Sequence, residues 1–283
     1  MTSIVGILCQ DGVVIGADSS VTYVHEGPKF SQSMIEQPFE KIEIIDNHVI
    51  LVGTGAIGQG QRFKAIVQRA WNSKELRSKD ALTGGKILSA EAINDFAETR
   101  AHQGTYGALV AFPCYGKAHL TEFALSDFQP EMKTDKLWFT SMGSAQHITD
   151  TFLAFLKEVF WEKTIPNVND GIFAAKWTLD HAVKINPGGV NGPVRIAILE
   201  KTGDSHKARI IPEEELQEHA QAIADAKTAL AKFRNNYASV NHEDVPNIPQ
   251  PIASIDPDSS DTDSTNQKPN LAVSQVTKKI NRH

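Results

Sequence analysis

The stretch that decides the fold stands at the start of the chain and reads TSIVGILCQDGVVIGADS, residues 2–19. Two apolar runs, Ile4–Cys9 and Val13–Ala17, flank the short polar segment Gln10–Gly12. An Asp-Gly pair between two apolar runs is a strong signal for a β-hairpin with a tight turn. Parallel neighbours would need a long crossover connection, so this spacing predicts an antiparallel sheet.

The hairpin pattern returns further along the chain. Lys41–Ile45 and Val49–Gly53 are apolar runs on either side of Asp46-Asn47, which again indicates a tight turn between antiparallel strands. Later apolar runs predict further strands, at 106–112, 118–125, 137–140, 194–199 and 208–211.

Helices are predicted where apolar residues recur three and four apart. Ser89 is expected to cap the second helix, and Ile148, Phe152, Phe155 and Val159 share one face of the third. The order of elements is then strands, two helices, strands, two helices, strands. Two antiparallel sheets with helix pairs on their outer faces would bury these patterns, which predicts an α+β fold, a four-layer αββα sandwich. The expected helices are 59–73, 89–101, 145–161 and 172–183.

The C-terminal part divides into a helix and a tail. Leu216, Ile223, Leu230 and Tyr237 recur every seven residues in a charged setting, a seam that suits either a partner helix or the helix's own domain. After residue 240 the composition turns to Pro, Asp, Ser, Thr and Asn, which cannot bury enough apolar surface to order itself. We therefore expect a domain over 2–211, a helix over 212–240 and a disordered tail over 241–283.

Bulk composition excludes several classes of protein. Hydrophobic residues make up 41% of the 283 residues, enough for a sizeable core, and the net charge of −6 argues against a nucleic-acid partner. Neither a signal peptide nor a membrane span is apparent, which predicts a cytoplasmic protein. The two cysteines, Cys9 and Cys114, make neither a disulfide framework nor a metal site, and no cofactor is expected.

Thr2 becomes the first residue once Met1 is removed, and threonine is small enough for that removal. A threonine hydroxyl is a weak nucleophile that needs an adjacent base. A terminal threonine carries that base as its own α-amine, whose pKa of about 7.7–8.0 suits general-base catalysis near neutral pH. A Met-Thr start is common, however, so this feature gains weight only from the rest of the chain.

The segment Gly53–Gly58 matches the pattern G-x-G-x-x-G of dinucleotide sites. It follows the second arm of a hairpin instead of opening a βαβ unit, and residues 72–85 are mostly polar where a second apolar strand should stand. We therefore reject a dinucleotide site. Backbone N–H groups of such a turn can instead stabilise a developing oxyanion.

Four segments together resemble the β-type subunits of proteasomes and their bacterial relatives, which are N-terminal nucleophile (Ntn) hydrolases. The resemblance covers roughly residues 2–211. The short start and the long tail look most like the proteasome homologues of certain proteobacteria. The segments that carry the resemblance are Thr2–Asp18, Lys41–Asp46, Gly53–Ala56 and Ser141–Ala145.

The resemblance implies a catalytic set. Thr2 corresponds to the nucleophile, Lys41 to a buried lysine that lowers neighbouring pKa values, and Asp18 to its partner carboxylate. Gly55 corresponds to the oxyanion donor. Ser144 corresponds to a serine that hydrogen-bonds near the amine, and it is also a candidate N-cap of the following helix.

The resemblance also implies where substrate binds and where this chain departs from the family. Thr22 corresponds to the backbone that receives the substrate strand, and Gly53 to the gate of the first specificity pocket, which should be roomy. An insertion over 24–37 is expected to lengthen a loop near the substrate groove. Lys184 and Pro187 stand where the family has an aspartate and a serine.

The function implied by the resemblance is a threonine peptidase that cleaves peptides or unfolded proteins inside a homo-oligomeric ring of about six or seven subunits. An ATPase unfoldase is a possible partner of such a ring. Two alternatives stay open, an Ntn amidohydrolase acting on a small amide and a non-catalytic ring subunit.

Overall fold

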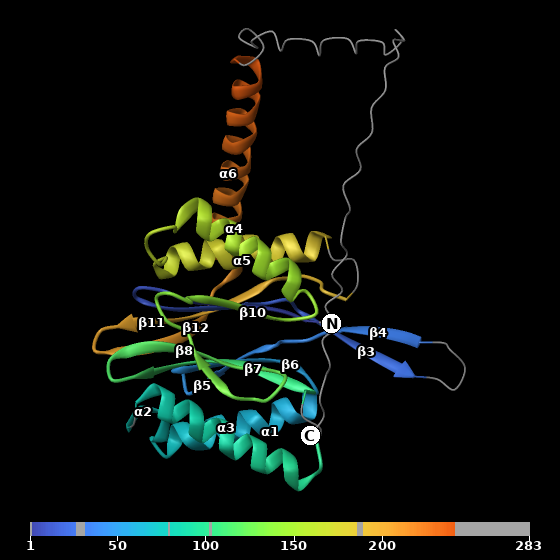
Figure 1. Cartoon of the computed structure of the whole chain (residues 1–283), viewed down its shortest axis with the longest axis vertical. Helices are drawn as coiled ribbons and strands as arrows, with labels where there is room; N and C mark the ends of the chain where they lie inside the picture. Colours follow the sequence, from blue (N-terminus) through green and yellow to red (C-terminus); the bar gives the residue numbers. More distant parts are fainter. Residues whose placement is uncertain (1, 27–31, 79, 102–103, 186–188, 241–283) are drawn as a thin grey trace, which may run out of the picture. The chain divides into compact units, whose positions relative to one another are not determined.

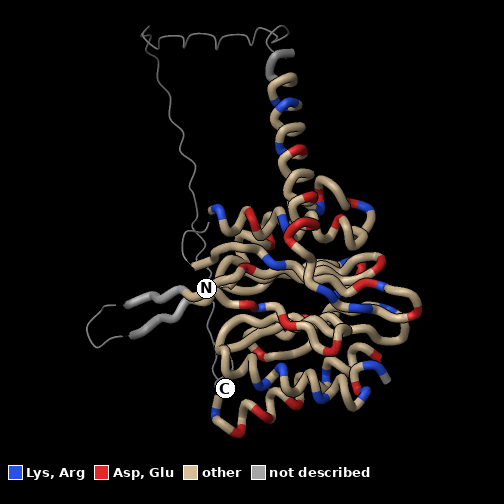
Figure 2. Tube along the Cα trace, turned by 180° about the vertical axis from the view of Figure 1, so that it is seen from behind, with Lys and Arg blue, Asp and Glu red and all other residues tan. Residues whose placement is uncertain are grey.

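The computed structural model describes residues 2–26, 32–78, 80–101, 104–185 and 189–240. Two five-stranded antiparallel sheets lie face to face, and helices cover the outer face of each sheet (Figure 1). This is the αββα sandwich predicted from the order of the elements. Acidic and basic residues are interspersed over both helical layers and both sheets (Figure 2).

The first sheet is built around the N-terminal hairpin. Leu8 pairs with Val13, and the Cys9 N–H donates to the Gly12 carbonyl at 2.8 Å, which closes the turn predicted at Asp11-Gly12. Its strands are, in order across the sheet, β10 (Phe139–Gly143), β1 (Ser3–Leu8), β2 (Gly12–Ala17), β11 (Arg195–Thr202) and β12 (Ser205–Ile210).

The second sheet contains the other predicted hairpin. Asp46 and Asn47 have φ values of 49° and 59°, as a type I′ turn requires, and this turn matches the right-handed twist of the strands that it joins. The strands in order are β5 (Ile42–Ile45), β6 (Val49–Gly55), β7 (Tyr106–Cys114), β8 (Lys117–Phe123) and β9 (Pro130–Met132).

The inserted segment is not the plain loop that we expected. It contains an antiparallel ribbon of β3 (Ser20–Glu26) and β4 (Gln32–Pro38), which projects from the sandwich beside the N-terminus (Figure 1). The β-branched and aromatic residues at 21–24 favour a strand, and a loop prediction overlooked them.

Helices cover the two sheets from outside. The second sheet packs against α1 (Ile57–Asn72), α2 (Glu75–Ser78) and α3 (Ala81–Glu98). The first sheet packs against α4 (Gln146–Phe160) and α5 (Val168–Ile185). Apolar clusters therefore fill three levels, one under each helical layer and one between the sheets.

The start of α3 corrects one prediction. The helix begins eight residues before Ser89, at Ala81, and Asp80 caps it by accepting the Thr83 N–H at 2.9 Å. Ser89 is a buried residue inside the helix, where its hydroxyl donates to the Phe128 carbonyl at 2.8 Å. The Gly84-Gly85 pair concealed the start of the helix, because glycine is unfavourable inside a helix.

The buried face of α4 is a second correction. Leu153 and Leu156 are fully buried, whereas Phe155 and Val159, on the face singled out from the sequence, are each 46% exposed. Apolar residues surround most of this helix, so their spacing cannot select the side that packs. The consequence is an exposed apolar strip on α4.

The apolar seam of the C-terminal helix α6 (Glu213–Val240) is buried in its first half and exposed in its second half. Leu216 and Ile223 belong to the cluster under α4 and α5, while Leu230 is 48% exposed and Phe233 71% exposed. The helix's own domain thus accounts for the first half of the seam. The chain splits into two compact units at Asn235, and the second unit is described only as the end of α6.

Two further sequence predictions concern the tail and the membrane. Residues 241–283, predicted to be disordered, lie outside the described residues. Among the helices that the structure describes, none is both long enough and apolar enough to span a membrane.

Candidate active site

Thr2 stands immediately before β1 and lines a cavity of about 750 Å³. The cavity also contacts Lys41, Gly53, Gly55 and Ser144, so one space brings together five of the seven residues singled out from the sequence. Strands from both sheets therefore converge on the predicted nucleophile.

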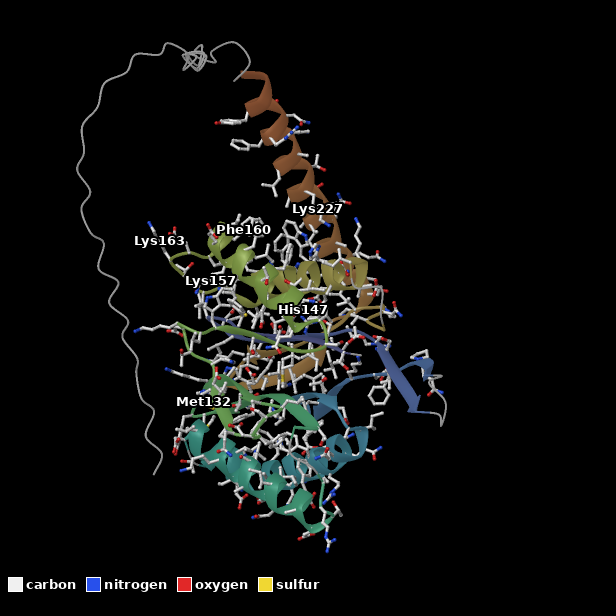
Figure 3. All side chains as sticks on the ribbon, turned by 45° about the vertical axis from the view of Figure 1, so that its right-hand side comes forward. Met132, His147, Lys157, Phe160, Lys163 and Lys227 are labelled. Atoms are coloured by element: carbon white, nitrogen blue, oxygen red, sulfur yellow. The ribbon has the colours of Figure 1, made fainter. Side chains whose placement is uncertain are left out.

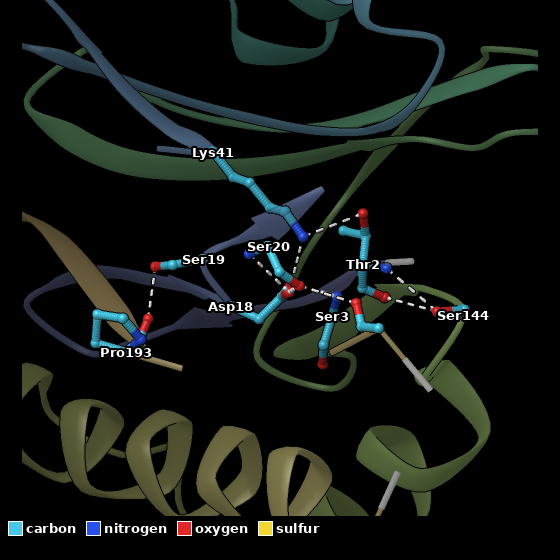
Figure 4. A network of polar contacts seen from close by, with 9 residues as sticks. Thr2, Ser3, Asp18, Ser19, Ser20, Lys41, Ser144 and Pro193 are labelled. Carbon is cyan, nitrogen blue, oxygen red and sulfur yellow. Dashed lines mark hydrogen bonds and ion pairs between the residues drawn. The ribbon is translucent and has the colours of Figure 1, made fainter. Parts of the chain in front are cut away.

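Asp18 and Lys41 form a buried ion pair beside Thr2 (Figure 4). Their charged atoms lie 2.5 Å apart, and their side chains are 0% and 3% exposed, respectively. Asp18 also accepts hydrogen bonds from the Ser3 N–H at 2.8 Å and from the Ser20 hydroxyl at 3.0 Å. A buried carboxylate needs such partners, because losing water is otherwise costly for a charge.

The same lysine reaches the hydroxyl of Thr2. Lys41 Nζ lies 3.3 Å from Thr2 Oγ1, within hydrogen-bond distance (Figure 4). A positive charge at this distance favours the deprotonated form of the hydroxyl. Asp18 in turn holds the ammonium group in place.

Ser144 contacts the backbone of Thr2 on its other side. The Thr2 N–H donates to Ser144 Oγ at 3.2 Å, and the Ser144 hydroxyl lies 3.3 Å from the Thr2 carbonyl oxygen. In the printed sequence this N–H belongs to the peptide bond after Met1, and removal of Met1 would turn it into a free amine. The alternative role of Ser144 as N-cap is wrong, because the cap of α4 is Ala145, without a side-chain hydrogen bond.

Gly143 is a residue whose importance sequence reasoning missed. Its φ of +100° lies in the region that favours glycine, and a Cβ here would lie 2.2 Å from the Thr2 carbonyl oxygen. Glycine thus lets β10 approach the nucleophile's backbone. The signal was available inside Ser141–Ala145, but only the structure shows what the residue contacts.

Ser20 is a second missed residue, because it follows Asp18 by two positions in a stretch without a motif. Its hydroxyl lies 2.9 Å from the Gly189 carbonyl oxygen as well as near Asp18, so it links the ion pair to the segment after α5.

Gly55 and Gly53 occupy the wall formed by β6. Gly55 has φ of +103°, and a Cβ there would lie 2.0 Å from the Thr105 carbonyl oxygen. A Cβ on Gly53 would lie 2.3 Å from the hydroxyl oxygen of Tyr106. Tyr106 therefore occupies the room directly above Gly53 that we expected to be open.

The structure describes only part of the position predicted to receive the substrate strand and of the two positions at which the chain differs from the family. Thr22 lies in β3, paired with Glu36, and its side chain lies outside the described part. Lys184 is exposed at the end of α5, and Pro187 falls outside the described residues.

Other chemistries find less support at this site. Burial, and then the charge of Asp11, raises the pKa of the Cys9 thiol well above its usual value, which disfavours a nucleophilic thiolate. Burial also raises the pKa of Cys114. Over the described ranges, His, Cys, Asp and Glu side chains make no group of three or more that could hold a metal ion.

Comparisons with known proteins agree with this architecture. The sequence profile of the family described as proteasome subunit matches residues 1–187. The solved structure of Anbu (ancestral beta-subunit) from Yersinia bercovieri is similar, with a TM-score of 0.57 over 82% of this chain and 97% of that chain. Sequence identity to it is 13%, so this likeness concerns the fold alone. The family match covers well over half of the chain, and the chain therefore belongs to the proteasome subunit family.

Proposed function

We propose that this chain is a threonine-dependent peptidase in which Thr2 is the nucleophile and its α-amine is the base. The observation that carries the proposal is the contact of Thr2 Oγ1 with Lys41 Nζ at 3.3 Å, while that lysine is held by the buried carboxylate of Asp18. These contacts bring together a candidate nucleophile, a fixed positive charge and a cavity that could hold substrate.

The proposed reaction begins after removal of Met1. The α-amine of Thr2 takes the hydroxyl proton as Thr2 Oγ1 attacks the carbonyl carbon of a peptide bond. The N–H of Gly55 stabilises the oxyanion that forms, and the protonated amine then gives its proton to the leaving nitrogen. Water, activated by the same amine, releases the acyl group from Thr2.

Each neighbouring residue has a proposed role in these steps. Lys41 lowers the free energy of the deprotonated hydroxyl, and Asp18 keeps the ammonium group oriented. Ser144 holds the backbone nitrogen of Thr2 at 3.2 Å, the atom that carries the proton during the reaction. The backbone at Thr22 and the wall at Gly53 are the proposed positions of the substrate strand and of its first side chain.

The direct test is hydrolysis of fluorogenic peptides by the full chain and by Thr2→Ala. We expect Thr2→Ala to lose hydrolysis and to keep its circular dichroism spectrum. Thr151→Ala is a matched control, because this hydroxyl bonds within α4, to the His147 carbonyl. Undiminished hydrolysis by pure Thr2→Ala would contradict the mechanism.

Mass spectrometry completes the test. A free Thr2 terminus and attachment of a peptide boronate to Thr2 would support the proposal. Turnover of small amides without turnover of peptides would favour the amidohydrolase alternative. A retained Met1 with no turnover of either would favour a non-catalytic ring subunit.

We also propose that the chain self-assembles into a ring of about six or seven subunits, because a free peptidase in the cell needs confinement. Support comes from large apolar side chains left exposed on α4 and α6. Phe155, Val159 and Phe160 are 46%, 46% and 44% exposed, respectively, and Leu230 is 48% exposed. Figure 3 shows Phe160 at the end of α4 and Lys227 on α6, on the same side of the sandwich.

Light scattering during size exclusion tests the assembly. We expect the full chain and a form without residues 241–283 to elute as the same oligomer, since a polar, proline-rich tail offers little apolar area. Substituting Phe155→Glu and Val159→Glu together should dissociate it, because these side chains are exposed in the single chain. A mass of 31.0 kDa for the full chain would refute self-assembly.

A further inference from the structure

Tyr106 forms part of the wall of the cavity beside Thr2. It begins β7, opposite Gly55 on β6, and its ring lies between two glycines. A Cβ on Gly53 would lie 2.3 Å from its hydroxyl oxygen, and a Cβ on Gly60 would lie 3.1 Å from its ring. Glycine at both positions therefore makes room for this ring between the strand and α1.

The hydroxyl of Tyr106 is a polar group without a partner in the part of the chain that the structure describes. The residue is 6% exposed and lines the cavity. Burial, and then the charge of Glu43, raises the pKa of this tyrosine, so the hydroxyl remains protonated and can donate a hydrogen bond. Its oxygen is not among the fully buried polar atoms of the described residues, so it is open to solvent from the cavity. A ligand that displaces water from this hydroxyl without supplying a hydrogen bond loses affinity, whereas a ligand that supplies one keeps it.

The charged groups of the cavity wall are paired within the chain. A charged substrate side chain would therefore compete with an existing ion pair, whereas a neutral one would not. The pairs are Lys41 with Asp18, Glu43 with Lys64, and Glu40 with Arg195.

We propose that Tyr106 determines specificity by hydrogen-bonding an uncharged polar side chain on the residue whose carbonyl Thr2 attacks. The substrate class is peptides with glutamine or asparagine at that position, because a carboxamide both donates and accepts. An apolar side chain would leave the hydroxyl unsatisfied, and such sites discriminate against ligands that lack the hydrogen bond. This inference rests on the proposed function for the identity of the attacked residue.

The first test compares hydrolysis of three peptides that differ only in glutamine, leucine or lysine at that position. We expect the full chain to prefer glutamine over leucine about tenfold in kcat/KM, the value of one hydrogen bond. Tyr106→Phe removes one oxygen atom and keeps the ring, and should bring this ratio close to one. Tyr115→Phe, a change at an exposed tyrosine in the turn at the far end of β7, should leave the ratio unchanged.

A second test measures binding without turnover. Calorimetry with the Thr2→Ala protein uses peptides that end in glutamine, leucine or lysine, with and without Tyr106→Phe. A preference for glutamine that Tyr106→Phe removes supports the inference, even if no peptide is ever cleaved, in which case the peptidase proposal alone fails. Equal binding of the three peptides, a preference for lysine, or a preference that survives Tyr106→Phe in a folded protein overturns it.

Discussion

Replacing Lys41 by methionine keeps most of the apolar stem of this side chain and removes its ammonium group. The change leaves Asp18 without its charged partner. The Asp18 side chain is 0% exposed, and its carboxylate lies 2.5 Å from that ammonium. Removing one partner of a buried ion pair typically costs about 3–5 kcal/mol, because the remaining charge is left uncompensated. The structure therefore predicts a marked loss of stability.

The surroundings of Asp18 lower this estimate. The carboxylate keeps the Ser3 N–H at 2.8 Å, the Ser20 hydroxyl at 3.0 Å and the Ser20 N–H at 3.3 Å. Hydrogen bonds to a charged group are each worth about 1.5–3 kcal/mol, so part of the charge stays stabilised. We expect a net loss of about 2–4 kcal/mol, or roughly 4–16 °C in melting temperature for a domain of this size.

Thermal unfolding of Lys41→Met, Asp18→Asn and the double variant measures this loss. All samples need one protein concentration, because assembly would otherwise shift the melting temperature. Arg69→Met is the matched control, since it breaks an exposed pair with Glu91 and should cost less than about 1 kcal/mol. The double variant should be more stable than Lys41→Met, because it no longer buries an unpaired charge.

Two outcomes would refute this reasoning. One is a melting temperature of Lys41→Met no lower than that of the control. The other is a double variant no more stable than the single one. Lys41→Met should also lose peptide hydrolysis, measured on folded protein below its melting temperature.

Two further predictions concern backbone strain and pH. Gly143→Ala should lower the free energy of unfolding, measured by chemical denaturation, by about 1–3 kcal/mol and should reduce hydrolysis, because the methyl group would meet the Thr2 carbonyl. Gly203→Ala is the control: Gly203 also has a positive φ, but it lies in open space, so this variant should leave hydrolysis intact. Burial, chiefly, holds the pKa of His119 below its unfolded value of about 6.5, so the folded state binds fewer protons than the unfolded state as the pH falls through that value. The melting temperature should therefore fall from about pH 7.5 to about pH 5.5, and it should fall less in His119→Gln; an identical pH profile in that variant would rule the histidine out.

Features set by a few adjacent residues could be predicted from the sequence. The turn at Asp46-Asn47 needs two residues that tolerate positive φ. The turn at Asp11-Gly12 needs only a short polar segment between two apolar strands, and the hydrogen bond from the Cys9 N–H to the Gly12 carbonyl closes it. Both signals are local, and both hairpins are present. The αββα order followed from them, because antiparallel pairs with helices between them leave few ways to bury each apolar face.

Features that depend on distant parts of the chain could not be predicted in this way. The start of α3 is concealed by Gly84-Gly85, which are tolerated because Leu76 and Pro130 pack closely against them. The packed side of α4 could not be chosen, because Leu153 and Phe155 offer similar apolar patterns on opposite faces. Tertiary packing overrides propensity at both places.

The candidate site shows the same division. Asp18, Lys41 and Ser144 were assigned by resemblance, and the structure places all three in contact with Thr2 or with each other. Tyr106 was missed because its position depends on the space left by Gly53, a relation that no spacing along the chain encodes.

The geometry around Asp18 couples folding and the proposed chemistry. Its carboxylate accepts the Ser3 N–H and so anchors the start of β1, where Thr2 is attached, and it also orients the Lys41 ammonium that contacts the Thr2 hydroxyl. A change at Asp18 therefore shifts the position and the protonation of Thr2 together.

Loss of hydrolysis in Asp18→Asn alone would not distinguish these effects. Asn keeps an acceptor for the Ser3 N–H, whereas Lys41→Met keeps that anchor and removes the charge. If both variants hold β1 in place, as amide exchange of Ser3 can show, then their common loss of hydrolysis must come from the broken Asp18–Lys41 ion pair and not from a displaced Thr2.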